Sequence, residues 1–441
     1  MQRAFAQAIS TADVPDAGKN IAAISVAGQQ HGMVVLDARN DVLRPAKLWN
    51  DTESSIDSTA LRSALSDEAW ARACGSVPLA AFTITKLAWL KREEPTTFDK
   101  VAKVLLPHDW INFKLTHEFT TDRGDASGTG YWSPRSNEYD LGLLALVDSH
   151  RDWNSLLPTV RGPRDLAGHL EREAAEALGV RTGIPVSVGT GDNMAGALGL
   201  GQRPGDVAIS IGSSGTIFAT SNQLACDPSG AVAGFADATG RYLPLVCVLN
   251  ATFVTDAVAR LLTLTPSAAS DLALTAPLGS RGLTLVPYFS GERTPNEPDA
   301  SGVLSGLRSN VTREDLARAA FEGVACGLLE GLDTLVSLGP FVESPVIVLI
   351  GGGSRSPAFR DVLATLASKP VVIPHDLEVV STGASLQAAS IATGTDFDEI
   401  SEAWGLRGGD VVEPRYSVES VSEVRRRYAD ARELAIRYAT P

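Results

Sequence analysis

The chain has 441 residues, of which 44% are hydrophobic and 20% are charged, and its net charge is −14 at pH 7. This length and composition are typical of two globular domains, and the acidic balance argues against nucleic acid or an anionic membrane surface as the main partner. No apolar run approaches the roughly 20 residues of a membrane span or forms a signal-peptide core, and the four cysteines form no CxxC pair, so we expect a cytoplasmic protein with buried thiols.

The first half of the chain alternates helical and extended patterns. Helices are expected at 2–10, 83–92, 107–115 and 171–178, and another is expected to open at 50–52. Strands are expected at 21–27, 33–36, 42–49, 101–106 and 184–188. Residues 118–165 are polar and predict irregular structure.

The second half continues the alternation. Strands are expected at 207–211, 217–220, 231–236, 242–248, 283–287 and 345–350. Helices are expected at 252–262, 312–338, 357–366, 382–392 and 421–438. Thr312 with Asp315 resembles a capping box at the start of the longest helix. Strands and helices that alternate in both halves predict an α/β protein.

Asp192 stands at the end of a buried strand and the start of a small-residue helix. The apolar residues Ile184, Val186 and Val188 predict the strand, and the glycines at 189 and 191 interrupt it. Open α/β sheets bind ligands at this carboxyl edge. The alternative is that Asp192 is only a helix N-cap.

Two glycine-rich turns are candidates for phosphate binding. GSSGT at 212–216 lies between two strands, and its free amides are suited to wrap phosphates, although an ordinary hairpin turn is the alternative. GGGSRS at 351–356 follows a strand and precedes a helix, which favours a polar or anionic ligand or a close packing turn. The chain has no Walker loop, GxSxG elbow or HExxH motif.

Two segments resemble the signatures of the FGGY carbohydrate kinases. The first, at 81–93, reads AFTITKLAWLKRE and has the Thr-x-x-Lys-Leu-x-Trp-Leu pattern, although Ala81 stands where a larger residue or glycine is common. The second, at 302–322, reads GVLSGLRSNVTREDLARAAFE. Three further segments are similar to family members that act on xylulose: AGQQHG at 27–32, LWND at 48–51 and PYFSGERTPNEPDA at 287–300.

The resemblance implies a fold and an activity. The fold is the two-domain ATPase fold of actin, hexokinase and the heat-shock chaperones, with ribonuclease H-like domains at 1–195 and 196–441 around an interdomain cleft. The activity is ATP-dependent phosphorylation of a small ketose, first of all D-xylulose to D-xylulose 5-phosphate. Ribulose, gluconate or a sugar alcohol as substrate remains open, and so does a catalytically weak sugar- or nucleotide-binding protein.

The resemblance also implies roles for the residues near the first domain's carboxyl edge. Asp192 matches the family's catalytic aspartate, which takes the proton of the sugar hydroxyl, and it is also the expected metal ligand. The sugar is expected to contact Gln30, His31, Trp49 and Asn193. Without the resemblance, His31 is interpreted as a turn residue and Trp49 as a core residue.

ATP and Mg²⁺ are the implied cofactors. The ATP phosphates are expected at Ser213, Ser214 and Gly215. The adenosine is expected at Gly306, Gly352, Gly353 and Ser356. Glu292 and Arg293 belong to a prominent family loop, and we interpret them as an ion pair that braces it.

The main departure from the family is at the start of the chain. No segment matches the Asp-x-Gly-Thr phosphate loop of the family's first strand, so the N-terminal domain is expected to be incomplete and the chain to be a poor kinase. A mis-assigned start or a truncation explains this better than an evolved loss, because Asp192 and both signatures are intact. A homodimer is an open alternative for the assembly, since the sequence does not determine the oligomeric state.

Overall fold

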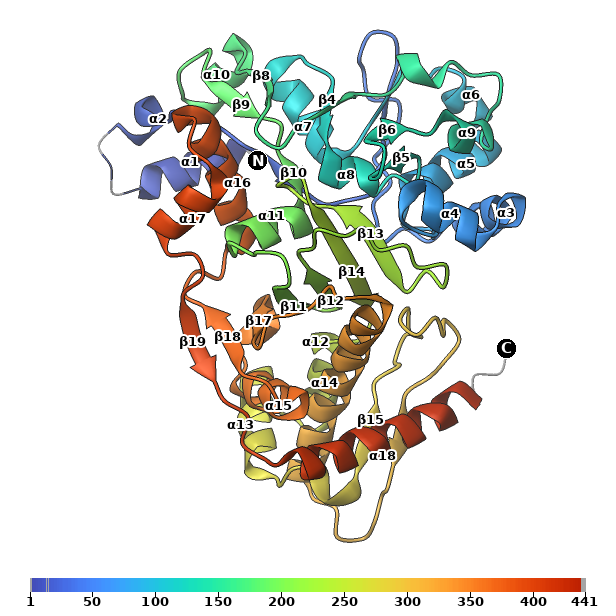
Figure 1. The fold of residues 1–441 in the computed structure, drawn as a ribbon, viewed down its shortest axis with the longest axis vertical. Helices are drawn as coiled ribbons and strands as arrows, with labels where there is room; N and C mark the ends of the chain where they lie inside the picture. Colours follow the sequence, from blue (N-terminus) through green and yellow to red (C-terminus); the bar gives the residue numbers. More distant parts are fainter. Residues whose placement is uncertain (1, 13, 15, 438–441) are drawn as a thin grey trace. The chain divides into compact units, whose positions relative to one another are not determined.

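The chain divides into two units, each built from helices and strands. The first contains Met1–Gln202, Asn222–Leu243 and Glu378–Arg407; the second contains Arg203–Ser221, Pro244–Leu377 and Gly408–Pro441. Figure 1 shows this computed structural model, which describes residues 2–12, 14 and 16–437. The domain boundary expected at 195/196 stays a prediction.

The first unit contains most of the short strands. Its strands are β1 (Ala27–Gly28), β2 (Val34–Leu36), β3 (Lys103–Leu105), β4 (Thr120–Asp122), β5 (Trp132–Ser133), β6 (Glu138–Tyr139), β7 (Thr159–Arg161), β8 (Leu166–His169), β9 (Pro185–Ser187), β10 (Thr190–Gly191) and β13 (Val232–Ala236). Its helices are α1 (Gln2–Thr11), α2 (Ala17–Asn20), α3 (Ser55–Ala64), α4 (Asp67–Cys74), α5 (Thr83–Glu93), α6 (Pro95–Phe98), α7 (Pro107–Thr116), α8 (Arg123–Ser127), α9 (Leu141–Ala145), α10 (Arg172–Leu178), α11 (Asp192–Gly199), α16 (Val379–Thr393) and α17 (Phe397–Trp404).

The second unit is organised around a mixed sheet. Its strands are β11 (Val207–Ile211), β12 (Gly215–Ala219), most of β14 (Tyr242–Val248), β15 (Thr284–Val286), β16 (Val303–Ser305), β17 (Ile347–Ile350), β18 (Val371–Pro374) and β19 (Gly409–Val412). Its α-helices are α12 (Thr252–Leu261), α13 (Pro266–Thr275), α14 (Arg313–Leu338), α15 (Pro357–Ala367) and α18 (Val418–Arg437). Within this unit the sheet strands follow the order β14-β12-β11-β17-β18-β19.

Strand direction in this sheet determines where its loops lie. β11 is antiparallel to β12 and parallel to β17, and β17 is parallel to β18. α14 packs on β12, where Gly331 leaves no room for a side chain beside Ile217. Its start is the expected capping box: Thr312 accepts from the Asp315 amide while the Asp315 carboxylate accepts from the Thr312 amide.

A parallel pairing organises the first unit. Ala27 pairs with Thr190 and Gly28 with Gly191, and Ile24 forms an isolated bridge with Val186. The strand expected at 21–27 is shorter than predicted. The segment that pairs with it is divided into β9 and β10, because Gly189 between them has a φ of 76°.

The prediction of irregular structure at 118–165 is wrong. This segment contains β4, α8, β5, β6, α9 and β7. Its polar residues misled the prediction because several of them start helices: Asp122 caps α8 and Asp140 caps α9.

Two further predictions from composition have structural outcomes. All four cysteines are free; Cys74, Cys247 and Cys326 are buried, but Cys226 is half-buried and its Sγ accepts a hydrogen bond from Arg135, so the expectation of buried thiols is wrong there. Among the described residues, no helix combines the length and hydropathy of a transmembrane span.

Close packing of α11 against α16 yields a stability prediction (Figure 1). A Cβ atom on Gly383 would overlap with the Ala195 carbonyl oxygen of α11. Gly383→Ala should therefore destabilise the protein by about 1–3 kcal/mol, because the two backbones must separate. The matched control is Gly196→Ala on α11, where the nearest atoms are 3.9 Å from the added Cβ. It should be neutral or stabilise by about 0.5–1 kcal/mol. Denaturant unfolding measures both, and equal stability of the two variants would contradict the packing argument.

Candidate active site

Two polar turns of the first unit lie beside each other because β1 and β10 are parallel. β1 leads into residues 29–32, and β10 leads directly into Asp192. The two turns are joined by a hydrogen bond of 3.0 Å from Asn193 Nδ2 to Gln30 Oε1. The structure thus brings together Gln30, Asp192 and Asn193.

Asp192 is not the N-cap of α11, so that alternative is wrong. Gly191 occupies the cap position, and Asp192 is the first helical residue. Its Oδ1 accepts hydrogen bonds from the Asn193 amide at 2.8 Å and from Asn193 Nδ2 at 3.0 Å, which leaves Oδ2 outside these bonds. Burial raises the pKa of the Asp192 carboxyl above its ordinary value, and the bonds from Asn193 oppose that rise only in part.

The Gln30 amide is oriented by its surroundings. Its side chain is buried, and a Cβ atom on Gly191 would stand only 2.7 Å from Gln30 Cγ. Its Oε1 accepts from Asn193, whereas its buried Nε2 has no hydrogen-bond partner among the described residues. A buried donor of this kind is costly unless something binds it, so it is suited to a ligand hydroxyl.

His31 is held in a strained turn by contacts from several elements. Its φ is 64°, and its Nδ1 lies 2.6 Å from the Gly128 carbonyl oxygen. Because a carbonyl only accepts, Nδ1 carries the proton in this bond. The ring stacks on Phe82 at 4.9 Å and lies 5.4 Å from Phe235, while Thr83 donates to the His31 carbonyl.

The sequence does not predict that Phe82 and Phe235 lie beside His31 in the folded chain. Phe82 lies within the segment at 81–93 that resembles a family signature, which was the available signal. Phe235 lies in β13, some two hundred residues after His31, and no local pattern indicated its position.

Trp49 is not joined to the other predicted sugar-binding residues. The pairing of Met33 with Lys47 brings its loop near the turn at 29–32, and the Trp49 side chain is 39% exposed. No hydrogen bond or ring contact among the described residues joins it to Gln30, His31 or Asp192. The interpretation of Trp49 as a core residue is wrong, because this exposure excludes a core position.

The two glycine-rich turns of the second unit also lie side by side. Ser210 of β11 pairs in parallel with Ile350 of β17, so the turns that follow the two strands leave the same sheet edge. Ile211 pairs with Gly215, which confirms that GSSGT is a hairpin turn. The Thr252 amide stabilises the turn by donating a hydrogen bond of 3.0 Å to the Gly212 carbonyl.

Close packing explains why some positions of these turns are glycine, but not all. Cβ atoms on Gly351 and Gly353 would collide with Ile211, and one on Gly215 would collide with Leu328 and Val248. Close packing therefore explains these three. Nothing lies within 4 Å of a Cβ on Gly352, so packing does not require glycine there.

Gly306 and Ser356 have structural explanations of their own. Gly306 has a φ of 78° and packs against the Gly282 carbonyl, so the backbone requires glycine. The Ser356 hydroxyl caps α15 and lies 2.8 Å from Ser270 Oγ. Ser356 is the last residue of the turn that follows β17, whereas Gly306 lies outside both turns.

Glu292 braces its loop through hydrogen bonds. Its carboxylate accepts from the Leu249 amide and the Arg293 amide at 2.7 Å and from Asn250 Nδ2 at 2.8 Å. The amide of Ala251, which follows Asn250 in the chain, donates to the Ser213 carbonyl. Among the described residues no ion pair joins Glu292 to Arg293, so the expected ion pair is wrong. Burial raises the pKa of Glu292.

One group of described residues has three side chains whose potential metal-ligating atoms lie within 4.8 Å of one another: His108, Asp122 and Asp125. Asp192 is not part of this group. The predicted metal role of Asp192 stays a prediction.

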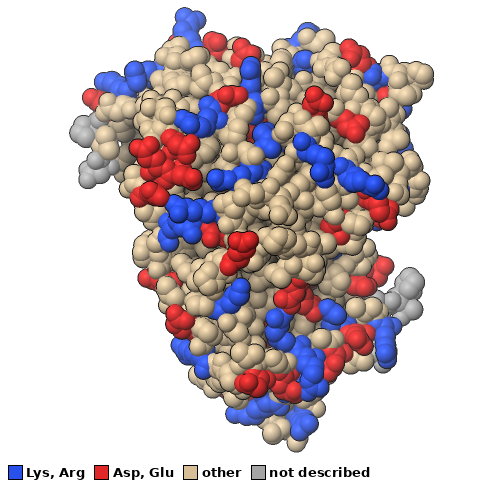
Figure 2. Space-filling model, viewed as in Figure 1, with Lys and Arg blue, Asp and Glu red and all other residues tan. Residues whose placement is uncertain are grey.

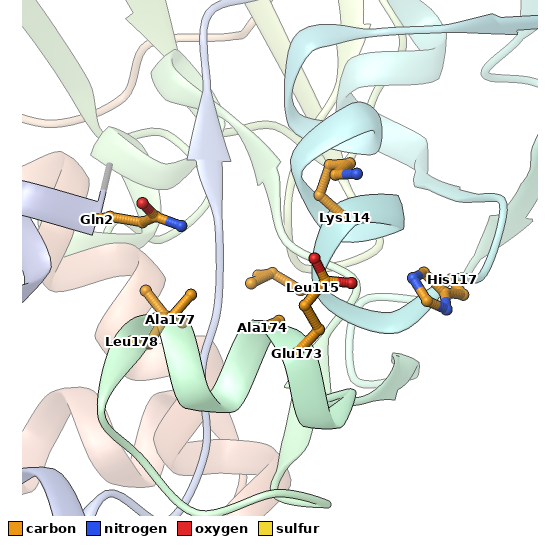
Figure 3. Close-up of a pocket in the computed structure, with 8 residues that line it drawn as sticks. All are labelled: Gln2, Lys114, Leu115, His117, Glu173, Ala174, Ala177 and Leu178. Atoms are coloured by element: carbon orange, nitrogen blue, oxygen red, sulfur yellow. The ribbon is translucent and has the colours of Figure 1, made fainter. Parts of the chain in front are cut away.

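A pocket elsewhere in the first unit does not involve the predicted site residues. A pocket of about 120 Å³ lies between α1, α7 and α10, and its polar lining residues are Gln2, Lys114, His117 and Glu173 (Figure 3). None of the predicted site residues lines it. Figure 2 shows acidic and basic side chains interspersed over the face that it draws.

Known proteins resemble this chain over most of its length. The chain is 44% identical over 399 residues to a protein named xylulose kinase from Streptomyces coelicolor, which covers 90% of this chain and 80% of that protein. The crystal structure of a xylulose kinase from Bifidobacterium adolescentis has a TM-score of 0.81 and 36% identity and covers 98% of this chain and 92% of that one. The structure of a gluconate kinase from Lactobacillus acidophilus has a TM-score of 0.88 and 25% identity and covers 100% of this chain and 88% of that one.

The fold and the family follow from these findings. The structural neighbours are sugar kinases of the actin- and hexokinase-like ATPase fold, as expected from the sequence. The N-terminal domain of the FGGY family of carbohydrate kinases matches residues 1–199, and its C-terminal domain matches residues 207–392. The chain therefore belongs to the FGGY family of carbohydrate kinases and is a sugar kinase.

Proposed function

We propose that this sugar kinase transfers the γ-phosphoryl group of ATP to the terminal hydroxyl of D-xylulose. The observation that carries the proposal is the joined set of Asp192, Asn193 and Gln30, with His31 in the same turn as Gln30. The names of the relatives at 44% and 36% identity support xylulose over gluconate, which is named for a structural neighbour at 25% identity.

Asp192 is the proposed general base. Phosphoryl transfer has a loose transition state, so the attacking hydroxyl needs positioning more than early deprotonation. Asn193 holds Oδ1, so Oδ2 is the oxygen proposed to accept the hydroxyl proton. The raised pKa of Asp192 makes it a better proton acceptor than an exposed aspartate.

Gln30, His31 and Asn193 are the proposed sugar contacts. The unpartnered Gln30 Nε2 donor fits a sugar oxygen, and the His31 ring is held by Gly128 and Phe82 so that its orientation is fixed before the sugar binds. Trp49 is proposed as an apolar wall, which agrees with its partial exposure.

The turns that follow β11 and β17 are the proposed nucleotide site. Ser213, Ser214 and Gly215 are proposed to hold phosphates, because small residues in a tight hairpin present backbone amides. Gly352 and Gly353 are proposed to contact adenosine, and Gly352 fits best because its side is open. Gly306 and Ser356 remain proposals with less support, since packing and capping already explain them.

Mg²⁺ is proposed as the cation of this reaction. A carboxylate oxygen is a ligand that Mg²⁺ accepts, so Asp192 is proposed to contribute to binding the ion. When bound, the ion neutralises charge on the transferring phosphoryl group.

The substrate is tested with a coupled assay of ADP release in Mg²⁺ and ATP, supplied in turn with D-xylulose, D-ribulose, D-gluconate and xylitol. D-Xylulose should give the highest kcat/KM, and mass spectrometry should identify D-xylulose 5-phosphate. A preference for another sugar would contradict the substrate, and sugar binding without turnover would indicate a catalytically weak binding protein.

Asp192→Asn tests the base. The rate of sugar phosphorylation should fall by about 10²–10⁴-fold while ATP binding is retained. Because the pKa of Asp192 is raised in the folded state, its charge opposes folding above that pKa. The Asn variant should therefore be at least as stable at pH 7, and this advantage should vanish below the ordinary aspartate pKa, where both side chains are neutral. Turnover within threefold of the parent would remove Asp192 from the mechanism.

His31→Ala tests the sugar turn, with His117→Ala as its matched control. Both histidines have a positive φ, 64° and 59°, so both variants carry the same kind of backbone strain. Loss of a buried hydroxyl partner costs about 1–3 kcal/mol, so only His31→Ala should raise the KM for sugar, by about 5- to 150-fold. The KM for ATP should change little. Similar sugar KM values for the two variants would assign His31 a purely structural role.

Glu292→Gln tests the support of the phosphate turn. The new amide group places a donor beside donors at Leu249 or Asn250, so one or more hydrogen bonds are lost. The KM for ATP should rise about 3- to 10-fold with little change for sugar. The control is Glu297→Gln in the same loop, whose side chain makes no hydrogen bond among the described residues. An unchanged KM for ATP in Glu292→Gln would contradict this role.

A further inference from the structure

A buried cluster of charged side chains lies in the first unit, under the two polar turns. It consists of His108 and Asp109 at the start of α7, Asp122 at the end of β4, and Asp125 in α8. All four are buried. His108 Nδ1 lies 2.6 Å from Asp125 Oδ2 and 3.4 Å from Asp109 Oδ1, and its Nε2 lies 3.8 Å from Asp122 Oδ1.

The cluster places one imidazole among three carboxyl groups. Burial opposes a charged imidazole, but the carboxylates of Asp109, Asp125 and Asp122 outweigh it and raise the pKa of His108 to about 10. Burial also raises the pKa values of Asp109 and Asp125, while His108 lowers them in opposition. His108 is therefore a cation at neutral pH, and it forms ion pairs with all three of these carboxylates.

Asp122 connects the cluster to the strand that ends at Asp192. Its Oδ2 accepts hydrogen bonds from Thr190 Oγ1 and from the Gly124 amide, both at 2.7 Å, and its Oδ1 accepts from the Asp125 amide at 3.1 Å. Thr190 precedes Asp192 by two residues in the chain. The position of this carboxylate thus fixes the end of β10.

His108 and α8 connect the cluster to the turn that carries Gln30 and His31. A Cβ atom on Gly28 would stand 2.7 Å from His108 Cβ, and one on Gly189 would stand 3.2 Å from its Cδ2. The histidine is thus packed between the residues that lead into the two turns. At the other end of α8, the Gly128 carbonyl oxygen holds the His31 ring at 2.6 Å.

We propose that His108 is a positioning residue, which compensates the buried carboxylates of Asp109, Asp122 and Asp125 and thereby holds β1, β10 and α8 where Gln30, His31 and Asp192 can bind the sugar. This inference rests on the proposed function for its sugar. The geometric part of the inference, that His108 orders both turns, does not depend on the proposed function.

A bound metal ion is the alternative for these residues, and the hydrogen bonds argue against it. Both oxygens of Asp122 already accept bonds from three protein donors, and Asp125 Oδ2 is bonded to His108. A metal would have to displace these partners. A cation supplied by the chain itself offsets the charge of the same carboxylates without that loss, although Asp109 Oδ1 and Asp125 Oδ1 accept no hydrogen bond among the described residues.

The test uses the variant His108→Gln, the double variant His108→Gln/Asp125→Asn, and Leu61→Ala as a control for general destabilisation. Leu61 is buried in α3 of the same unit and lies outside the cluster. Two measurements are made on the 441-residue chain: the Kd for D-xylulose by calorimetry, and hydrogen exchange of the peptides that cover 27–32 and 188–194. The hairpin at 207–219 is the internal reference for exchange.

His108→Gln should weaken D-xylulose binding about tenfold or more and should speed exchange in both peptides. The double variant should recover part of both losses, because it removes one uncompensated carboxylate. Leu61→Ala should lower the melting temperature without these local effects. If the parent chain binds no D-xylulose, the proposed substrate is wrong, and the exchange measurement still decides the positioning role.

Two results would overturn the inference. The first is exchange at 27–32 and 188–194 in His108→Gln that equals exchange in Leu61→Ala. The second is stoichiometric binding of added Zn²⁺ that stabilises the parent chain and is lost in His108→Gln, because it would make the cluster a metal centre.

Discussion

The parallel pairing of β1 with β10 places two polar turns of the first unit side by side, and the proposed sugar site depends on it. Parallel strands end at the same sheet edge, so the residues after Gly28 meet those after Gly191. The paired residues are small, and Gly191 leaves room for the Gln30 side chain. Asn193 then joins Gln30 to Asp192 through hydrogen bonds of 3.0 Å. Without this short ladder the three side chains would belong to unrelated loops.

The second unit repeats this construction with different residues. β11 and β17 are parallel neighbours, and each ends in a glycine-rich turn. Packing of Gly351 and Gly353 on Ile211 brings the turns together, while Gly352 stays open. The contacts proposed for the sugar in the first unit are side chains, whereas those proposed for phosphates in the second unit are mainly backbone amides. This difference suits a sugar with many hydroxyls in one case and a phosphate chain in the other.

Buried charge supports both sets of turns. Glu292 accepts three hydrogen bonds beside the hairpin at 212–216, and Asp122 holds Thr190 beside Asp192. Burying a carboxylate is unfavourable, and hydrogen bonds or a nearby cation offset the penalty only when the geometry is held closely. Such residues therefore exchange some folding stability for a fixed arrangement of the turns.

The local features and the family of this chain could be predicted from its residues. The capping box of Thr312 and Asp315, the hairpin at 212–216 and the α/β alternation depend on neighbouring residues, and the signatures at 81–93 and 302–322 are contiguous. The folded structure was needed to show that Gly191 caps α11, that Glu292 braces its loop without an ion pair, and that His108 lies among three aspartates. It also revealed the bonds of His31 to Gly128 and of Thr190 to Asp122. These contacts join residues far apart in the chain, and no local pattern encodes them because the strand pairing that brings them together forms only in the folded protein.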